Sequence, residues 1–221
     1  VKELQGMGIQ PDIIVCRSEY PLDKGIKDKI ALFCNVPSSH VLQNLDVEYL
    51  YEAPLAMEEE HLAQVACECL NLPCPEPDLT DWKAMCTALK HPHGDVSVAL
   101  VGKYTQLHDA YISVVEALKH GGIANGVSVN IKWVDSEKVT SDNAAEFFND
   151  VSGIIVPGGF GDRGIEGMIQ AIRYARENSI PFLGLCLGMQ LTIVEFTRDV
   201  IGYNDAHSVE FLPGTTHPVI H

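Results

Sequence analysis

From residue 95 onward, short apolar runs alternate with segments whose apolar residues recur at helical spacing. Continuous apolar runs with β-branched residues predict strands that are buried on both faces. The predicted strands cover residues 96–102, 127–134, 153–157 and 181–185. The predicted helices cover residues 109–120, 144–148, 165–178 and 187–197. Strands that alternate with helices are typical of α/β folds, so we expect a parallel, doubly wound sheet.

The first 55 residues have the same character and predict a strand, a helix and a second strand. The apolar run at 12–17 predicts a buried strand, and residues 24–34 carry apolar side chains on one helical face. Asn35-Val-Pro37 breaks this helix, and residues 41–44 follow as an extended segment. We interpret these residues as the end of an α/β domain.

Residues 56–94 differ from both neighbouring regions and predict an interdomain linker. A helix over 55–70 precedes Leu72-Pro-Cys-Pro-Glu-Pro77, whose three prolines exclude a helix or a central strand. Another helix begins near Leu79 and ends at His91-Pro-His-Gly94. The expected domains are 1–55, 56–94 and 95–221.

Gly184-Leu-Cys-Leu-Gly188 has the form of a nucleophile elbow, in which a buried strand turns sharply into a helix. The central Cys186 would adopt a strained backbone conformation, and the flanking glycines would make room for the turn. Its sulfur would lie at a helix N-terminus, whose partial positive charge stabilises a thiolate. The N–H of Leu187 would be free to stabilise an oxyanion. A buried cysteine that only packs between strand and helix is the alternative interpretation.

A second glycine turn, in Ile154-Ile-Val-Pro-Gly-Gly-Phe-Gly161, ends the preceding predicted strand. Parallel topology brings this turn close to Cys186, because both strands end at the same edge of the sheet. Gly158 and Gly159 can point a backbone N–H at a carbonyl oxygen under attack by the thiolate. A simple strand-ending turn is the alternative, but the order and spacing of the two elements favour a catalytic site.

The balance of charge narrows the possible partners. Thirty acidic residues against fifteen basic ones give a formal net charge of −15, which argues against nucleic acid or an anionic membrane as a partner. Hydrophobic residues make up 46% of the chain, enough to bury a core, and no apolar run approaches the roughly 20 residues of a membrane span. The chain has seven cysteines, an odd number that cannot all pair in disulfides, and no secretory segment precedes them. We therefore expect a reducing, cytoplasmic location.

Three of the cysteines invite a metal interpretation. Cys67, Cys69 and Cys74 have the spacing C-x-C-x₄-C, which lacks a fourth ligand and fits no common zinc pattern. We therefore expect no metal site in this chain.

The second glycine turn, followed by Pro181-Phe-Leu-Gly-Leu-Cys-Leu-Gly-Met-Gln190, resembles the class I glutamine amidotransferases. Further motifs resemble the CTP synthase family over nearly the whole chain, most weakly at 53–93. They are Gly8-Ile-Gln-Pro-Asp12, Cys16-Arg-Ser18, Lys29-Ile-Ala-Leu-Phe-Cys-Asn-Val-Pro37, Gly102-Lys-Tyr104, Glu116-Ala-Leu-Lys-His-Gly-Gly122 and Gly159-Phe-Gly-Asp-Arg-Gly-Ile-Glu-Gly-Met168. The resemblance implies a flavodoxin-like glutaminase half-domain that follows the tail of a P-loop-like amidoligase domain.

The resemblance also implies a ligase of pyrimidine nucleotide biosynthesis that aminates UTP to CTP. In that family an amidoligase domain phosphorylates O4 of UTP with ATP and Mg²⁺. A glutaminase domain releases ammonia, which passes inside the protein to C4 of the uracil ring. The expected partners are glutamine, UTP and ATP, with GTP as allosteric activator and CTP as inhibitor. The family forms homotetramers and, in some members, filaments.

Matched residue by residue, the resemblance assigns roles in both halves. Cys186 would attack the glutamine amide to form a γ-glutamyl thioester, while the N–H groups of Gly159 and Leu187 hold the oxyanion. The expected glutamine-binding residues are Gly159, Leu187, Gly188, Met189, Gln190 and Glu210, the last of which would bind the α-amino group. Lys29 matches a lysine that contacts UTP or CTP, and Asp46 and Val47 match positions beside the adenine of ATP. Without the resemblance, Glu210 and Lys29 would be interpreted as solvated surface residues.

Parts of the family's machinery have no match in these residues. The family completes a catalytic triad with a His and a Glu downstream of the elbow, and neither is present here. The phosphate loop and the Mg²⁺ carboxylates are expected before Val1. Leu45 stands where the family has a basic residue. Val1 falls within a helical pattern and the apolar run at 216–221 would continue as a strand, so we expect a piece of a longer protein. Because the thiolate needs a base to protonate the leaving ammonia, this piece alone is expected to be inactive or nearly so.

Two other functions stay open. The chain could belong to another class I amidotransferase that feeds GMP, carbamoyl phosphate or anthranilate synthesis, although the block 29–37 favours the CTP synthase family. It could also be a non-catalytic piece that retains assembly surfaces, with the helix 109–120 as a contact.

Overall fold

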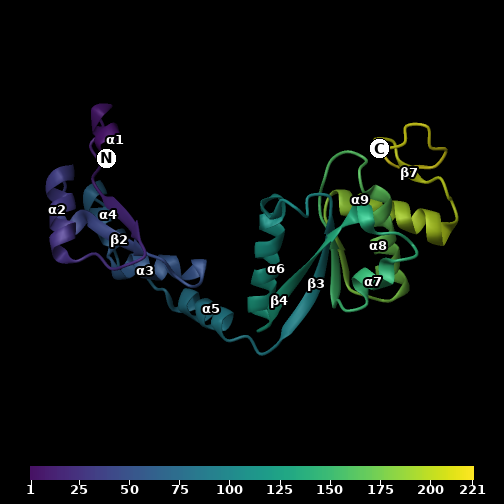
Figure 1. Cartoon of the computed structure of the whole chain (residues 1–221), viewed down its shortest axis with the longest axis horizontal. Helices are drawn as coiled ribbons and strands as arrows, with labels where there is room; N and C mark the ends of the chain where they lie inside the picture. Colours follow the sequence, from purple (N-terminus) through teal and green to yellow (C-terminus); the bar gives the residue numbers. More distant parts are fainter. The chain divides into compact units, whose positions relative to one another are not determined.

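The computed structural model describes all residues from Val1 to His221 and divides the chain into two compact units, Val1–Thr87 and Ala88–His221 (Figure 1). The boundary between the units falls within helix α5 (Thr80–Lys90). The three domains expected from the sequence stay a prediction. None of the helices combines the length and the apolar character that a bilayer crossing requires.

The first unit contains the expected strand, helix and strand. Strands β1 (Ile14–Ser18) and β2 (Val41–Leu45) pair in parallel, and helix α2 (Lys24–Cys34) connects them. Asp23 begins α2, because its side chain accepts the N–H of Ile26 at 2.8 Å. Asn35 ends the helix in the left-handed conformation. The short helices of this unit are α1 (Lys2–Gly6), η1 (Ser38–His40) and η2 (Leu50–Glu52).

The single helix predicted over 55–70 is wrong, because two helices occupy this segment. Helices α3 (Ala53–Glu59) and α4 (Leu62–Leu70) are separated at His61, whose φ is 59°. The break coincides with Glu60, whose carboxylate accepts hydrogen bonds from Lys27 Nζ at 2.8 Å and from the Gln43 side chain at 2.8 Å. These contacts join Glu60 to residues of α2 and β2 that are distant in the sequence. The helical periodicity of residues 55–70 does not predict them.

The second unit is built on one parallel sheet with the strand order β4-β3-β5-β6. Its strands are β3 (Asp95–Gly102), β4 (Ser128–Asp135), β5 (Gly153–Val156) and β6 (Phe182–Gly184). This order is that of flavodoxin-like sheets, so the predicted fold class is confirmed. β5 is buried along its whole length, as its continuous apolar run predicts.

Helices cover both faces of this sheet (Figure 1). Helix α6 (Ile112–Ala124) packs on β4, and α8 (Ile165–Glu177) packs on β5 from the other side, with α7 (Ala144–Phe148) beside it. The buried core of this unit includes Phe148 from α7, Met168 from α8 and Leu191. The remaining elements are η3 (His108–Tyr111), η4 (Ser136–Lys138), α9 (Leu187–Phe196), a π-helical turn (Thr197–Ile201) and the parallel pair β7 (His207–Ser208) and β8 (Pro218–Ile220).

Helix α6 continues through the glycine pair at which the sequence predicts its end. A Cβ on Gly122 would lie 2.6 Å from the carbonyl oxygen of Val127, whereas a Cβ on Gly121 would meet nothing within 4 Å. Gly122 therefore lets the end of α6 approach the segment that enters β4, and this tertiary contact outweighs the weak helix propensity of glycine.

The two glycines of α6 provide a matched test of this packing. Gly122→Ala should destabilise the second unit by about 2 kcal/mol through overpacking. Gly121→Ala should stabilise it by roughly 0.5–1 kcal/mol, because alanine favours helix. Urea unfolding of the 221-residue chain, followed by the fluorescence of Trp133 in a Trp82→Phe background, measures both. Equal stabilities of the two variants would contradict the packing role of Gly122.

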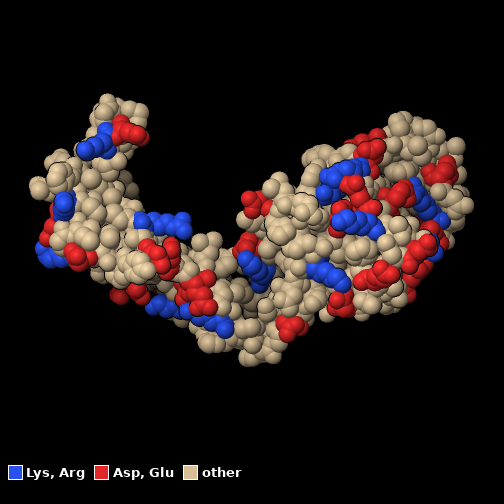
Figure 2. All heavy atoms as spheres, in the orientation of Figure 1, with Lys and Arg blue, Asp and Glu red and all other residues tan.

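Charged side chains of both signs are interspersed over the face of the molecule shown in Figure 2. Acidic side chains occur on this face in both units, so the excess of acidic residues is not confined to one tail. A surface of this kind repels polyanions while leaving local basic groups available to small ligands.

Candidate active site

Strands β3, β5 and β6 end at the same edge of the sheet, and the predicted nucleophile lies there. Val156 pairs with Gly184 at the ends of β5 and β6. Gly158 and Cys186 each follow these paired residues by two positions, so the register brings them to one place. The sheet order changes direction between β3 and β5, which is where open parallel sheets bind their ligands.

Cys186 adopts the strained conformation that the elbow motif predicts. Its φ is 51° and its ψ is −104°, a region that non-glycine residues rarely occupy. The residue precedes the first turn of α9 and its side chain is exposed. Three backbone hydrogen bonds hold the elbow: Leu185 N–H donates to Val156 O at 2.9 Å, Gly188 N–H to Leu185 O at 2.9 Å and Gln190 N–H to Cys186 O at 3.1 Å.

The glycines that flank Cys186 are required by close backbone contacts. A Cβ on Gly184 would lie 2.5 Å from the carbonyl carbon of Gly188, and a Cβ on Gly188 would lie 2.1 Å from the carbonyl oxygen of Val156. Neither space admits a methyl group. The sharp turn from β6 into α9 therefore depends on both glycines, and Cys186 is presented at its tip.

The glycine turn after β5, residues 157–161, faces this elbow. A Cβ on Gly158 would lie 3.5 Å from Cys186 Cβ, and a Cβ on Gly159 would lie 3.5 Å from Leu187 Cδ2. Leu187 is buried and occupies the first position of α9, where a backbone N–H has no partner within the helix. The structure thus brings together the three predicted groups: the thiol, the N–H of Leu187 and the glycine turn.

The other predicted glutamine-binding residues lie on or near the same elbow. Gly188 is buried, Met189 is 53% exposed and Gln190 is half-buried. Glu210 is exposed, and its N–H donates to Ser208 Oγ at 3.2 Å. Its carboxylate interacts electrostatically with Lys103, which lies at the end of β3.

Three residues of this site were missed in the sequence analysis. Lys103 directly follows β3 and is buried, with Nζ donating to the carbonyl oxygens of Phe160 and Gly161 in the glycine turn. Tyr111 Oη accepts the N–H of Lys103 at 3.1 Å, and Arg163 donates to the Lys103 carbonyl at 3.1 Å. The position of Lys103 in the sequence could have indicated its role, because a lysine directly after a buried strand lies at the ligand-binding edge of a parallel sheet.

Cys186 is an exposed free thiol, and no hydrogen bond joins it to a histidine side chain. His207 is buried, but its Nδ1 accepts the N–H of Ser208 at 2.9 Å and its Nε2 lies 3.9 Å from Glu166 Oε1. Burial lowers the pKa of His207, and the charge of Arg198 acts in the same direction. The chain also contains no group of three or more His, Cys, Asp or Glu residues that could hold a metal ion.

The predicted nucleotide-binding residues lie in the first unit. Asp46 and Val47 line a cleft of about 490 Å³ after β2, and Asp46 pairs with Arg17 at 3.5 Å. Apolar side chains of Leu45 and Leu50 also line this cleft, which suits the flat face of a purine. Lys29 is exposed on α2, and it lines none of the described cavities.

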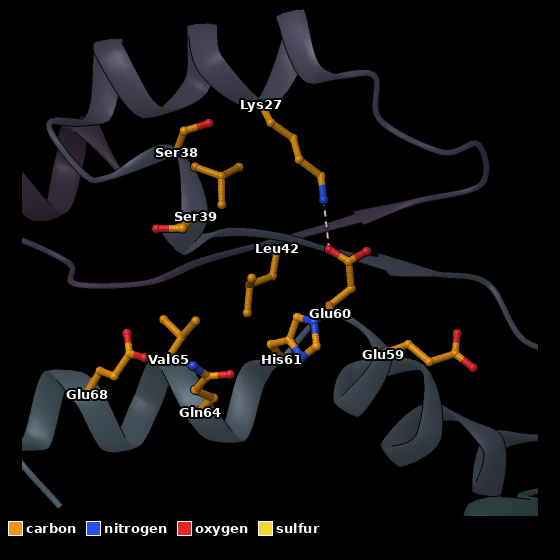
Figure 3. Close-up of a pocket in the computed structure, with 11 residues that line it drawn as sticks. Lys27, Ser38, Ser39, Leu42, Glu59, Glu60, His61, Gln64, Val65 and Glu68 are labelled. Atoms are coloured by element: carbon orange, nitrogen blue, oxygen red, sulfur yellow. Dashed lines mark hydrogen bonds and ion pairs between the residues drawn. The ribbon is translucent and has the colours of Figure 1, made fainter. Parts of the chain in front are cut away.

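A second cavity of the first unit, of about 460 Å³, lies between α2 and the α3–α4 break (Figure 3). Lys27, which lines this cavity, forms an ion pair from its Nζ to Glu60 Oε2 at 2.8 Å. Glu59 and Glu68 add further negative charge to the lining. Burial acts to raise the pKa of Glu60, but hydrogen bonds from Lys27 and Gln43 outweigh it and the pKa lies below its ordinary value. A lining with this excess of carboxylates disfavours nucleotide phosphates, so we assign the Lys27–Glu60 pair a structural role.

The family model for class-I glutamine amidotransferases matches residues 106–221, which include the whole of the elbow and the glycine turn. The chain belongs to this family. A second family model, for the N-terminus of CTP synthase, matches residues 1–72. The two matched segments, separated by residues 73–105, follow one another in the order that the resemblance implies.

Similarity to CTP synthases extends over the whole chain. The chain is 56% identical over 220 residues to the CTP synthase of Clostridium acetobutylicum. It is 54% identical over 220 residues to that of Halalkalibacterium halodurans, and both alignments cover all of this chain. The chain spans 41% of the length of each of these relatives. The predicted resemblance to the CTP synthase family is therefore confirmed.

One solved structure supports the same assignment. The glutaminase domain of the Trypanosoma brucei CTPS, solved with bound acivicin, is 44% identical and superposes with a TM-score of 0.54. The match covers 56% of this chain and 48% of that one.

Proposed function

We propose that this chain is the central part of a CTP synthase and that Cys186 is the nucleophile with which the enzyme takes ammonia from glutamine. The observation that carries the proposal is the strained Cys186 at the tip of a glycine-flanked elbow that faces a second glycine turn. The similarity to CTP synthases on both sides of the unit boundary supports UTP as the acceptor.

The chemistry follows from the groups at the elbow. The Cys186 thiolate attacks the amide carbon of glutamine, and the N–H groups of Gly159 and Leu187 stabilise the negative charge on the carbonyl oxygen. A base takes the proton of the Cys186 thiol and then, in its protonated form, donates it to the amide nitrogen, so that the C–N bond breaks and ammonia leaves. Water hydrolyses the γ-glutamyl thioester to glutamate and the free thiol. The base would come from residues of the enzyme outside this chain.

Glutamine would lie along residues 187–190, with its α-amino group on the carboxylate of Glu210. A carboxylate suits that cation, and the exposed position of Glu210 leaves it accessible to a ligand.

In the first unit, the cleft beside Asp46 and Val47 would hold the adenine of ATP, and Lys29 would contact UTP or CTP. ATP with Mg²⁺ supplies the phosphate that activates O4 of UTP, and ammonia displaces this phosphate at C4 to give CTP, ADP and inorganic phosphate. This chain offers no carboxylate cluster for Mg²⁺, so the metal would bind elsewhere in the enzyme. GTP activation, CTP inhibition, a homotetramer and a cytoplasmic location complete the proposal.

An isotope experiment tests the proposal. Full-length enzyme is incubated with UTP, ATP, Mg²⁺ and glutamine labelled with ¹⁵N in its side-chain amide, and the products are identified by mass spectrometry. We expect ¹⁵N in CTP, at one nitrogen per molecule. Hydrolysis of glutamine without amination of UTP would favour another class I amidotransferase, and the absence of both would favour a non-catalytic assembly role.

A further inference from the structure

The glycine turn, on which one oxyanion donor would lie, is not held by regular secondary structure. β5 ends at Val156 and α8 begins at Ile165, so the turn (residues 157–161) and the three residues after it lie between these two elements. Gly161 and Gly164 have φ values of 75° and 72°, which few other residues adopt. A segment this rich in glycine is conformationally permissive, and a donor on it must be fixed by contacts from elsewhere.

Lys103 provides such contacts from the neighbouring strand end. Its Nζ donates to the carbonyl oxygen of Phe160 at 3.0 Å and to that of Gly161. The residue is only 5% exposed, and its Cε would lie 3.7 Å from a Cβ on Gly159. The aliphatic stem therefore packs against Gly159, while the ammonium group holds the two carbonyls that follow it.

Lys103 is itself fixed by neighbouring side chains. Its N–H donates to Tyr111 Oη at 3.1 Å, and its carbonyl oxygen accepts from Arg163 Nη2 at 3.1 Å. Arg163 is paired in turn with Glu137. A Cβ on Gly102 would lie 2.5 Å from Tyr111 Oη, so only glycine admits the tyrosine at this point. The lysine is thus preorganised before any substrate binds.

The surroundings of Lys103 strengthen its hydrogen bonds. Burial lowers the pKa of Lys103, and the charge of Arg163 acts in the same direction, while the carboxylates of Asp162 and Glu210 oppose both. A charged donor that is largely shielded from water binds a carbonyl oxygen more strongly than the same donor on the surface.

We propose that Lys103 is a positioning residue for glutamine hydrolysis: its ammonium group fixes the glycine turn so that the N–H of Gly159 faces the carbonyl oxygen of a substrate held at Cys186. The inference rests on the function proposed above. Lys103 does not touch the reacting atoms, and no bond to it forms or breaks during the reaction.

Two reactions of the same thiol separate this role from a merely structural one. Attack on glutamine creates an oxyanion, whereas alkylation by iodoacetamide does not. In full-length enzyme, Lys103→Met should lower kcat for glutamine hydrolysis by about 10²-fold, with KM little changed and the alkylation rate of Cys186 unaltered. Lys132→Met is the matched control, because it removes an ammonium group that pairs with Asp150 on the surface of the same unit, and it should alter neither rate.

The outcomes distinguish this inference from the proposed function. If wild-type enzyme does not hydrolyse glutamine, the proposed function fails. If wild-type enzyme hydrolyses glutamine and Lys103→Met retains its kcat, only the role of Lys103 fails. A parallel fall in hydrolysis and alkylation would show that Lys103 maintains the elbow as a whole, and this too would overturn the positioning role.

Discussion

Replacing Cys186 with alanine in the full-length enzyme should abolish CTP formation from glutamine while leaving CTP formation from free ammonia intact. The sulfur of Cys186 is the only group at the elbow that can form the proposed thioester, so glutamine-dependent turnover should fall by about 10⁴-fold or more. In the proposed reaction, free ammonia needs no thioester and reacts directly with the activated uracil ring. The measurement is the rate of CTP formation with each nitrogen source at saturating UTP and ATP.

The variant Cys74→Ala is the control for this experiment. Cys74 is also an exposed cysteine, but it lies in the first unit and outside any elbow, so its removal should leave both activities unchanged. Loss of both activities in Cys186→Ala would mean that Cys186 is a structural residue, as a cysteine between a strand and a helix often is.

Gly188→Ala should produce the largest loss of stability among the glycine variants of the second unit considered above. The added methyl group would lie 2.1 Å from the carbonyl oxygen of Val156 and 2.9 Å from its carbonyl carbon. That oxygen also accepts the N–H of Leu185 at 2.9 Å, so it cannot move away without breaking the bond that shapes the elbow. We expect a loss of about 3 kcal/mol in the free energy of unfolding.

Gly158→Ala is the matched variant on the facing turn. Its Cβ would make an ordinary contact with Cys186 Cβ at 3.5 Å, so its stability should stay within about 0.5 kcal/mol of wild type. Urea unfolding of the 221-residue chain, monitored through Trp133 with Trp82 replaced by phenylalanine, compares the two. A Gly188→Ala variant as stable as Gly158→Ala would show that the close approach of α9 to β5 is not needed.

Much of the second unit could be predicted from the sequence because its elements are short, regular and strongly patterned. Buried parallel strands such as β5 are continuous apolar runs, and their carboxyl ends share one edge. Cys186 was found through its flanking glycines, which the elbow needs for steric reasons. These signals are local, and each lies within about ten residues of sequence.

What the sequence did not reveal depends on contacts between distant residues. The break at His61 coincides with hydrogen bonds from Lys27 and Gln43 to Glu60, and the continuation of α6 depends on how Gly122 meets Val127. Lys103 reaches a turn more than fifty residues away, since its partner Phe160 lies 57 positions along the chain. Pairings of this kind are set by the tertiary fold and leave no periodic signal.

The most direct test of the central claim is the site at which a glutamine-like electrophile reacts with the full-length enzyme. The adducts are located by peptide mass spectrometry over time, with and without glutamine. The account predicts that Cys186 is labelled first and that glutamine protects it, because the elbow exposes this thiol where the proposed glutamine site lies. Labelling of the exposed Cys74 at the same rate, or labelling of Cys186 that glutamine does not slow, would contradict it.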